Sequence, residues 1–187
     1  MRSFTYTILL AITAARTVAG VTIHYSGKVS DAAMVEKVLS KARTFADKHH
    51  WKVEDASADS GQLQRQVGEK EMVYRTRIRG LRISVAPQCE PLCLQFGEDC
   101  VLTDFVKTQF AGAEAHIGVV ELLEAIQPLF KSMEVYDEGE YWETHKKITL
   151  LRNLEAVDLM IAHVRKEHPN VHGPIFLANG RIVDLAD

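Results

Sequence analysis

Carboxylates and large aromatic rings are most concentrated in the segment 137–144, on both sides of a glycine. Such carboxylates can converge on a hard cation such as Mg²⁺ or Ca²⁺, but their spacing differs from the ligand register of an EF-hand loop. We therefore expect an exposed charged turn rather than a metal site. Two amphipathic rings beside a charged turn are typical of a recognition surface. The residues of this predicted surface are Asp137, Glu138, Glu140, Tyr141, Trp142 and Glu143, of which the first three are the metal-ligand candidates.

His116 and Asp104 are the candidates for acid–base chemistry. An imidazole titrates near neutral pH and can act as a general base, and His24 is a second candidate for that role. Together with Asp104 and the acids of 137–143, His116 could surround a divalent metal, as in a small metal-dependent hydrolase. The sequence has no nucleophile elbow, phosphate-binding glycine loop or paired-histidine protease motif. Catalysis would therefore depend on this cluster alone.

Cys89, Cys93 and Cys100 are soft metal-ligand candidates, with His116 as a fourth donor. A structural zinc site normally has two closely spaced pairs of ligands, and only half of that arrangement is present. Cys93 lies between two leucines, where a free cysteine commonly packs as a small hydrophobic residue. We expect neither zinc nor any other cofactor. A disulfide would require export, and geometry would decide which two cysteines form it.

Arg75, Arg77 and Arg79 alternate along one predicted strand and are the main concentration of positive charge. A nucleic-acid-binding sheet also carries aromatic rings that stack on bases, and none alternates with these arginines. The formal net charge of -3 adds no general attraction to nucleic acid. We expect the arginines to face solvent and to pair with acids on neighbouring strands, without binding nucleic acid.

Hydrophobic periodicity predicts the elements that hold these residues. Apolar residues that alternate are typical of half-buried strands, and apolar residues that recur every three or four positions are typical of helices. Strands are predicted at 21–25, 51–55, 72–85, 92–96 and 134–136, helices at 31–49, 113–133 and 145–167, and a hairpin at 175–183 around Asn179-Gly180, while 104–112 has no clear period.

Individual residues predict where these elements begin, bend or end. Ser30 and Thr144 are expected to cap the first and third helices. Pro128 removes a backbone donor and is expected to kink or break the second helix. At Gly80 the apolar alternation changes parity, so we expect a bulge or a turn there. The polar stretch 56–69 is expected to be a loop.

The order of these elements predicts an α+β fold with a mainly antiparallel sheet and helices on one of its faces. Without the extra strand of the central meander, the order is β-α-β-β-α-β, that of ferredoxin-like domains, followed by a C-terminal helix and β-hairpin. A chain of 187 residues, 47% of them hydrophobic, can bury one core without disulfides or a metal. We expect a hydrophobic leader at 1–20 and a single α+β domain at 21–187.

The segment 1–20 resembles a secretory signal peptide, with an early arginine, an apolar run and small residues at its end. The run is too short to span a bilayer, so we expect no integral membrane span in the mature chain. Polar residues dilute the run, and the few cysteines favour a reducing compartment. The sequence therefore predicts export if the leader is cleaved, which is the favoured prediction, and a cytoplasmic location otherwise.

Two functions are compatible with these patterns. The first is a non-catalytic binding or regulatory domain that presents 137–144 to a protein partner or a small ligand. The alternative is a small divalent-metal-dependent hydrolase built from Asp104, His116 and the acids of 137–143. Function must be argued from a site, and none of these patterns is specific to one reaction, so we expect binding rather than catalysis.

Overall fold

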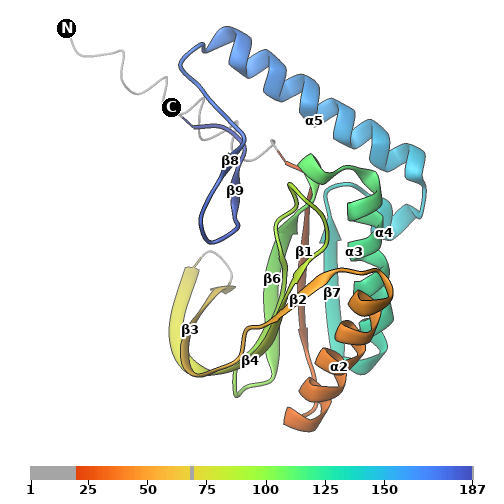
Figure 1. Cartoon of the computed structure of the whole chain (residues 1–187), viewed down its shortest axis with the longest axis vertical. Helices are drawn as coiled ribbons and strands as arrows, with labels where there is room; N and C mark the ends of the chain where they lie inside the picture. Colours follow the sequence, from red (N-terminus) through yellow and green to blue (C-terminus); the bar gives the residue numbers. More distant parts are fainter. Residues whose placement is uncertain (1–19, 68–69, 187) are drawn as a thin grey trace, which may run out of the picture.

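A three-stranded antiparallel sheet in the order β6-β1-β7 carries two of the predicted site residues, Asp104 and Asp137 (Figure 1). The computed structural model describes residues 20–67 and 70–186, so the predicted leader lies outside the described residues except for its last position. β1 (Thr22–Lys28) pairs with β6 (Val101–Lys107) on one side and with β7 (Ser132–Asp137) on the other. Ile23 and Tyr25 are buried, which is the alternation predicted for a half-buried strand.

Two helices cover one face of this sheet (Figure 1). α2 (Ala32–Lys48) and α3 (Ala113–Ile126) contact each other, and their buried aliphatic side chains belong to the same core as Ile23 and Tyr25 of β1. The helical periodicity of the sequence predicted both helices correctly. The other side chains of β1 therefore point to the opposite face of the sheet.

The ends of these helices differ in part from the predictions. Asp31, rather than Ser30, caps α2, because its Oδ1 accepts the N–H of Met34 at 2.9 Å. The Ser30 hydroxyl instead donates to the Asp31 carboxylate, which is the stronger acceptor. The break predicted at Pro128 is confirmed: α3 ends before it, and Pro128 lies in the short 3-10 helix η2 (Gln127–Leu129).

Strand β3 (Ala58–Val67), which pairs with β4 (Lys70–Ser84), lies within the stretch 56–69 that was predicted to be a loop. That prediction is wrong because β3 is a strand whose sequence is mostly polar and has no apolar alternation. Leu63 is buried, whereas its neighbours along β3 are exposed. The hydrogen-bonded ladder, and not an apolar alternation, defines this strand.

β4 passes through Gly80 without the predicted bulge or turn. Its pairing with β5 (Leu92–Phe96) stays in register across the glycine. A Cβ at Gly80 would lie 2.6 Å from the carbonyl oxygen of Leu94, so only glycine permits this close approach of β5. The apolar parity changes here because β4 exchanges its partner β3 for β2 (Lys52–Asp55).

The C-terminal part contains a short helix, a long helix and a hairpin. α4 (Tyr141–Thr144) precedes α5 (Lys147–Glu167), which begins without a side-chain cap. The cap predicted at Thr144 is therefore wrong: Thr144 belongs to α4, where its hydroxyl donates to the carbonyl of the preceding turn. β8 (Ile175–Phe176) and β9 (Ile182–Val183) form the predicted hairpin.

The fold class is mixed α+β with antiparallel sheets, as predicted. The stretch 104–112, for which no period was found, begins inside β6 and continues as the 3-10 helix η1 (Gln109–Ala111). In the parts of the chain that the structure describes, no helix is long and apolar enough to cross a membrane.

Candidate functional site

A buried chain of hydrogen bonds joins Thr108, His116 and Asp137. The Thr108 Oγ1 lies 2.7 Å from His116 Nδ1, and His116 Nε2 lies 3.0 Å from Asp137 Oδ2. A neutral imidazole protonated on Nε2 satisfies both contacts, since it accepts from the hydroxyl and donates to the carboxylate. The side chains of His116 and Asp137 are both 0% exposed. A solute therefore cannot reach this imidazole in the folded state.

Asp137 organises the turn that follows β7. Its Oδ1 accepts the N–H of Gly139 at 2.7 Å, and its Oδ2 accepts the N–H groups of Tyr141 and Trp142 at 2.8 and 2.9 Å. Burial raises the pKa of Asp137, but the hydrogen bonds from His116 and these backbone groups outweigh it, so the pKa lies below its usual range. Both carboxylate oxygens are occupied, so Asp137 offers no contact to a partner or a metal.

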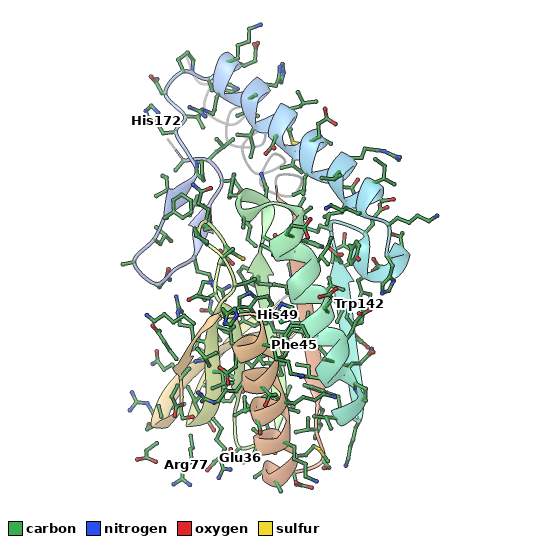
Figure 2. The ribbon with its side chains drawn as sticks, turned by 45° about the vertical axis from the view of Figure 1, so that its right-hand side comes forward. Glu36, Phe45, His49, Arg77, Trp142 and His172 are labelled. Carbon is green, nitrogen blue, oxygen red and sulfur yellow. The ribbon has the colours of Figure 1, made fainter. Side chains whose placement is uncertain are left out.

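The rest of the segment 137–144 divides between surface and core. Glu138 is half-buried, and its Oε2 accepts the N–H of Thr22 at 2.9 Å. Glu140 and Glu143 are exposed. Tyr141 and Trp142 are half-buried and pack against the core, and Figure 2 shows Trp142 on the α3 side of the molecule. The acids and the rings that were predicted to form one recognition surface are therefore not equally accessible to a partner.

Asp104 belongs to a different network from His116. On β6 it binds the guanidinium of Arg181 from the C-terminal hairpin, which also binds Glu90 at 3.0 Å and lies 4.0 Å from the centre of the Phe105 ring. Burial raises the pKa of Asp104, and the Arg181 guanidinium partly offsets this rise. The predicted metal cluster of Asp104 with His116 does not assemble. Among the described residues, no group of three His, Cys, Asp or Glu side chains is placed to hold a metal ion.

Glu90 is the buried anchor of this second network. Its side chain is 1% exposed, and its two oxygens accept the N–H groups of Lys107 and Ile182 in addition to the Arg181 guanidinium. The same arginine donates to the backbone carbonyl of Phe105 at 2.8 Å. Glu90 and Arg181 thus fasten the C-terminal hairpin to the edge of β6.

Three rings lie side by side on the face of the sheet that α2 and α3 do not cover. The register places Phe105 of β6, His24 of β1 and Tyr136 of β7 in one row. The ring centres of His24 are 5.8 Å from Phe105 and 5.9 Å from Tyr136. Phe105 is 38% exposed and Tyr136 is 64% exposed. We call these three residues the ring row.

A carboxylate lies at the His24 and Tyr136 side of the ring row. The Oε1 of Glu138 is 3.8 Å from Nε2 of His24, whose side chain is 48% exposed. Glu138 is thus the member of the predicted segment 137–144 that reaches the open sheet face. The ring row was missed because its members lie far apart in the sequence. The available signals were the alternation of Tyr136 with Val135 and Asp137, and that of His24 with Ile23 and Tyr25.

The cysteines are free thiols, and the arginine stripe pairs partly with a neighbouring strand, as predicted, and partly with helix α2. All three cysteines are free, and burial raises the pKa of the Cys93 thiol to about 11, so it is not a nucleophile at neutral pH. Arg79 binds Glu36 of α2 at 2.8 Å, and Arg77 lies 3.9 Å from Asp59 of β3. Figure 2 shows Arg77 and Glu36 at the opposite end of the molecule from the C-terminal segment.

No family model, curated protein or solved structure matches this chain.

Proposed function

We propose that this chain is a non-catalytic domain that binds a protein partner, and that the ring row with Glu138 forms its recognition surface. The single observation that supports this proposal is the exposure of three adjacent rings on one sheet face. Large rings dominate the energy of protein interfaces because they bury much area at a low cost in conformational entropy. Solvent-facing positions of a strand ordinarily carry polar residues, so three adjacent rings favour a contact surface.

The same proposal moves the recognition surface away from most of the segment 137–144. Asp137 is saturated by internal hydrogen bonds, and Trp142 packs half-buried against the core. Glu138 links the original segment to the ring row through its contact with His24.

The alternative hydrolase has less support. A general base must come within hydrogen-bonding reach of the proton that it removes. His116 is fully buried, and both of its ring nitrogens have partners within the protein. Asp104 is neutralised by Arg181. Binding is therefore the function that these side chains support best.

We also propose that β1, α2, β5, β6, α3 and β7 form a ferredoxin-like β-α-β-β-α-β core. This proposal is supported by the antiparallel pairing of β1 with both β6 and β7, and by the position of β5 beside β6. In such a core the helices cover one face and leave the other open to a partner.

The proposal can be tested by placing a photo-crosslinking amino acid at Tyr136 in the full chain. A matched control carries the same group at Val73 of β4, which is 59% exposed. With an extract of the source cells, we expect a discrete crosslinked product at position 136 only. An excess of wild-type chain should suppress this product, whereas a His24→Ala, Phe105→Ala double variant should not. Equal labelling at both positions, or equal competition by the variant, would refute the proposal.

A further inference from the structure

The strand spacing places Tyr136 on the same face of β7 as two acidic residues, one before it and one after it. Glu134 and Glu138 are two residues before and after Tyr136, and residues at that spacing share a face of a strand. The pairing with β1 continues past the end of β7, since the N–H of Glu138 donates to the carbonyl of Thr22. A cation above the Tyr136 ring would therefore meet an aromatic face and an acid on either side.

The chain itself shows that this sheet binds a guanidinium in such surroundings. At the other end of the ring row, Arg181 lies 4.0 Å from the centre of the Phe105 ring and binds the carboxylates of Asp104 and Glu90. A planar guanidinium can stack on a ring and donate to carboxylates at the same time, which an ammonium group does less well. The Tyr136 end offers the same two kinds of group, an aromatic face and carboxylates.

Local charge also favours a cationic ligand. The lysines of β6, β1 and β7 are Lys107, which is bound to Asp184 at 2.7 Å, and Lys28, which lies at the far end of β1 from His24. Lys28 is a diagonal neighbour of Glu134 in the register, but among the described residues neither lysine forms an ion pair with Glu134 or Glu138. A nucleic-acid strand could stack bases on the ring row, but these two acids would repel its phosphates.

We infer that the Tyr136 end of the ring row, with Glu134 and Glu138, binds the guanidinium group of an arginine in a segment of the partner protein. This inference rests on the proposed function and names the chemistry that the partner must present. The arginine would stack on the Tyr136 ring and form ion pairs with the two carboxylates.

The test uses the ¹⁵N-labelled full chain and a heptapeptide of threonine and serine with one central arginine. The control peptide has citrulline, which keeps the shape of the side chain and lacks its charge. We expect the arginine peptide to shift the amide signals of β7 and His24 in NMR spectra. Binding of the citrulline peptide should be weaker by about fivefold or more, because cation–π and ion-pair terms are lost.

Three variants of the chain separate this inference from a structural effect. Tyr136→Ala should weaken binding of the arginine peptide by about fivefold, whereas Tyr136→Phe should retain it because the hydroxyl is not needed. Glu134→Gln should also weaken it, whereas Val73→Ala, at an equally exposed site, should change nothing. Far-UV circular dichroism should show the same spectrum for all variants, because these side chains are exposed.

Equal binding of the two peptides, or no shift at β7, would overturn the inference. Tighter binding of a thymidine oligonucleotide than of the arginine peptide through the same residues would also overturn it. If the crosslink at position 136 persists while the two peptides bind equally, the arginine inference fails and the proposed function stands. Loss of the crosslink that is specific to position 136 would refute both the arginine inference and the proposed function.

Discussion

Asp137→Asn should lower the free energy of unfolding by about 3 kcal/mol, because asparagine replaces a buried acceptor with a donor. Asp137 Oδ2 accepts hydrogen bonds from His116 and from the N–H groups of Tyr141 and Trp142. The His116 imidazole can change tautomer, so that its Nε2 accepts a hydrogen bond from the amide of the new asparagine. The two backbone groups cannot, and each unpaired buried donor costs about 1–3 kcal/mol. A cost of about 1.5 kcal/mol for each of these two N–H groups gives the expected loss.

The same variant should change how stability depends on pH. The folded-state pKa of Asp137 is lowered, so its contribution to stability is complete above the unfolded pKa of about 4. The contribution is lost as the pH falls from there through the folded pKa. The difference in stability between the wild type and Asp137→Asn should therefore be constant near neutral pH and should shrink below about pH 4.

Urea denaturation followed by circular dichroism at a series of pH values measures both effects. Glu140→Gln is the matched control, since it removes an exposed carboxylate from the same turn and should change stability by less than about 0.5 kcal/mol. If Asp137→Asn were as stable as this control at neutral pH, Asp137 would not organise the turn. A pH-independent difference would show that the lowered pKa is wrong.

Three further changes test other parts of the structure. Leu39→Asp should cost about 3 kcal/mol or more, because it places an unpaired charge in the buried face of α2, and an unchanged melting temperature would contradict that face assignment. Arg181→Met should destabilise the C-terminal hairpin by about 2 kcal/mol, because the carboxylate of Glu90 stays buried without its partner. Hydrogen exchange at the Ile182 amide would then accelerate, and unchanged exchange would refute the anchor role. Cys93 should react with iodoacetamide at pH 8 about a hundredfold more slowly in the folded chain than in urea, because burial raises its thiol pKa to about 11, and equal rates measured by mass spectrometry would refute its burial.

Local patterns in the sequence predicted the elements whose signals are local. The apolar stripes of α2 and α3 and the Asn179-Gly180 turn of the C-terminal hairpin depend on residues within one element, and these predictions are confirmed. β3 was missed because it has no apolar alternation, and only its pairing with β4 makes it a strand. The Ser30 cap was wrong because a stronger acceptor, Asp31, follows it.

The site was harder to predict because its contacts join distant parts of the chain. Glu90 and Arg181 are 91 residues apart, and neither has a distinctive neighbour in the sequence. The ring row requires the register of β1 against both β6 and β7. A one-residue slip in either pairing would turn a ring toward the helices. Such a register follows from the packing of the whole sheet and cannot be read from one strand.

The acids of the segment 137–144 show why composition alone misplaced the surface. Asp137 accepts hydrogen bonds from three backbone N–H groups and an imidazole, so its charge stabilises the turn that follows β7. One carboxylate oxygen of Glu138 accepts the N–H of Thr22, and the other lies near His24 on the open face of the sheet. Asp137 therefore has a structural role, whereas the adjacent Glu138 reaches the surface. Their residue types alone do not reveal this difference. Because residues that alternate along a strand face opposite sides, burial of Asp137 on the helix side places Tyr136 and Glu138 on the open side. The burial of Asp137 thus determines that Tyr136 and Glu138 face the side of the sheet that a partner can contact.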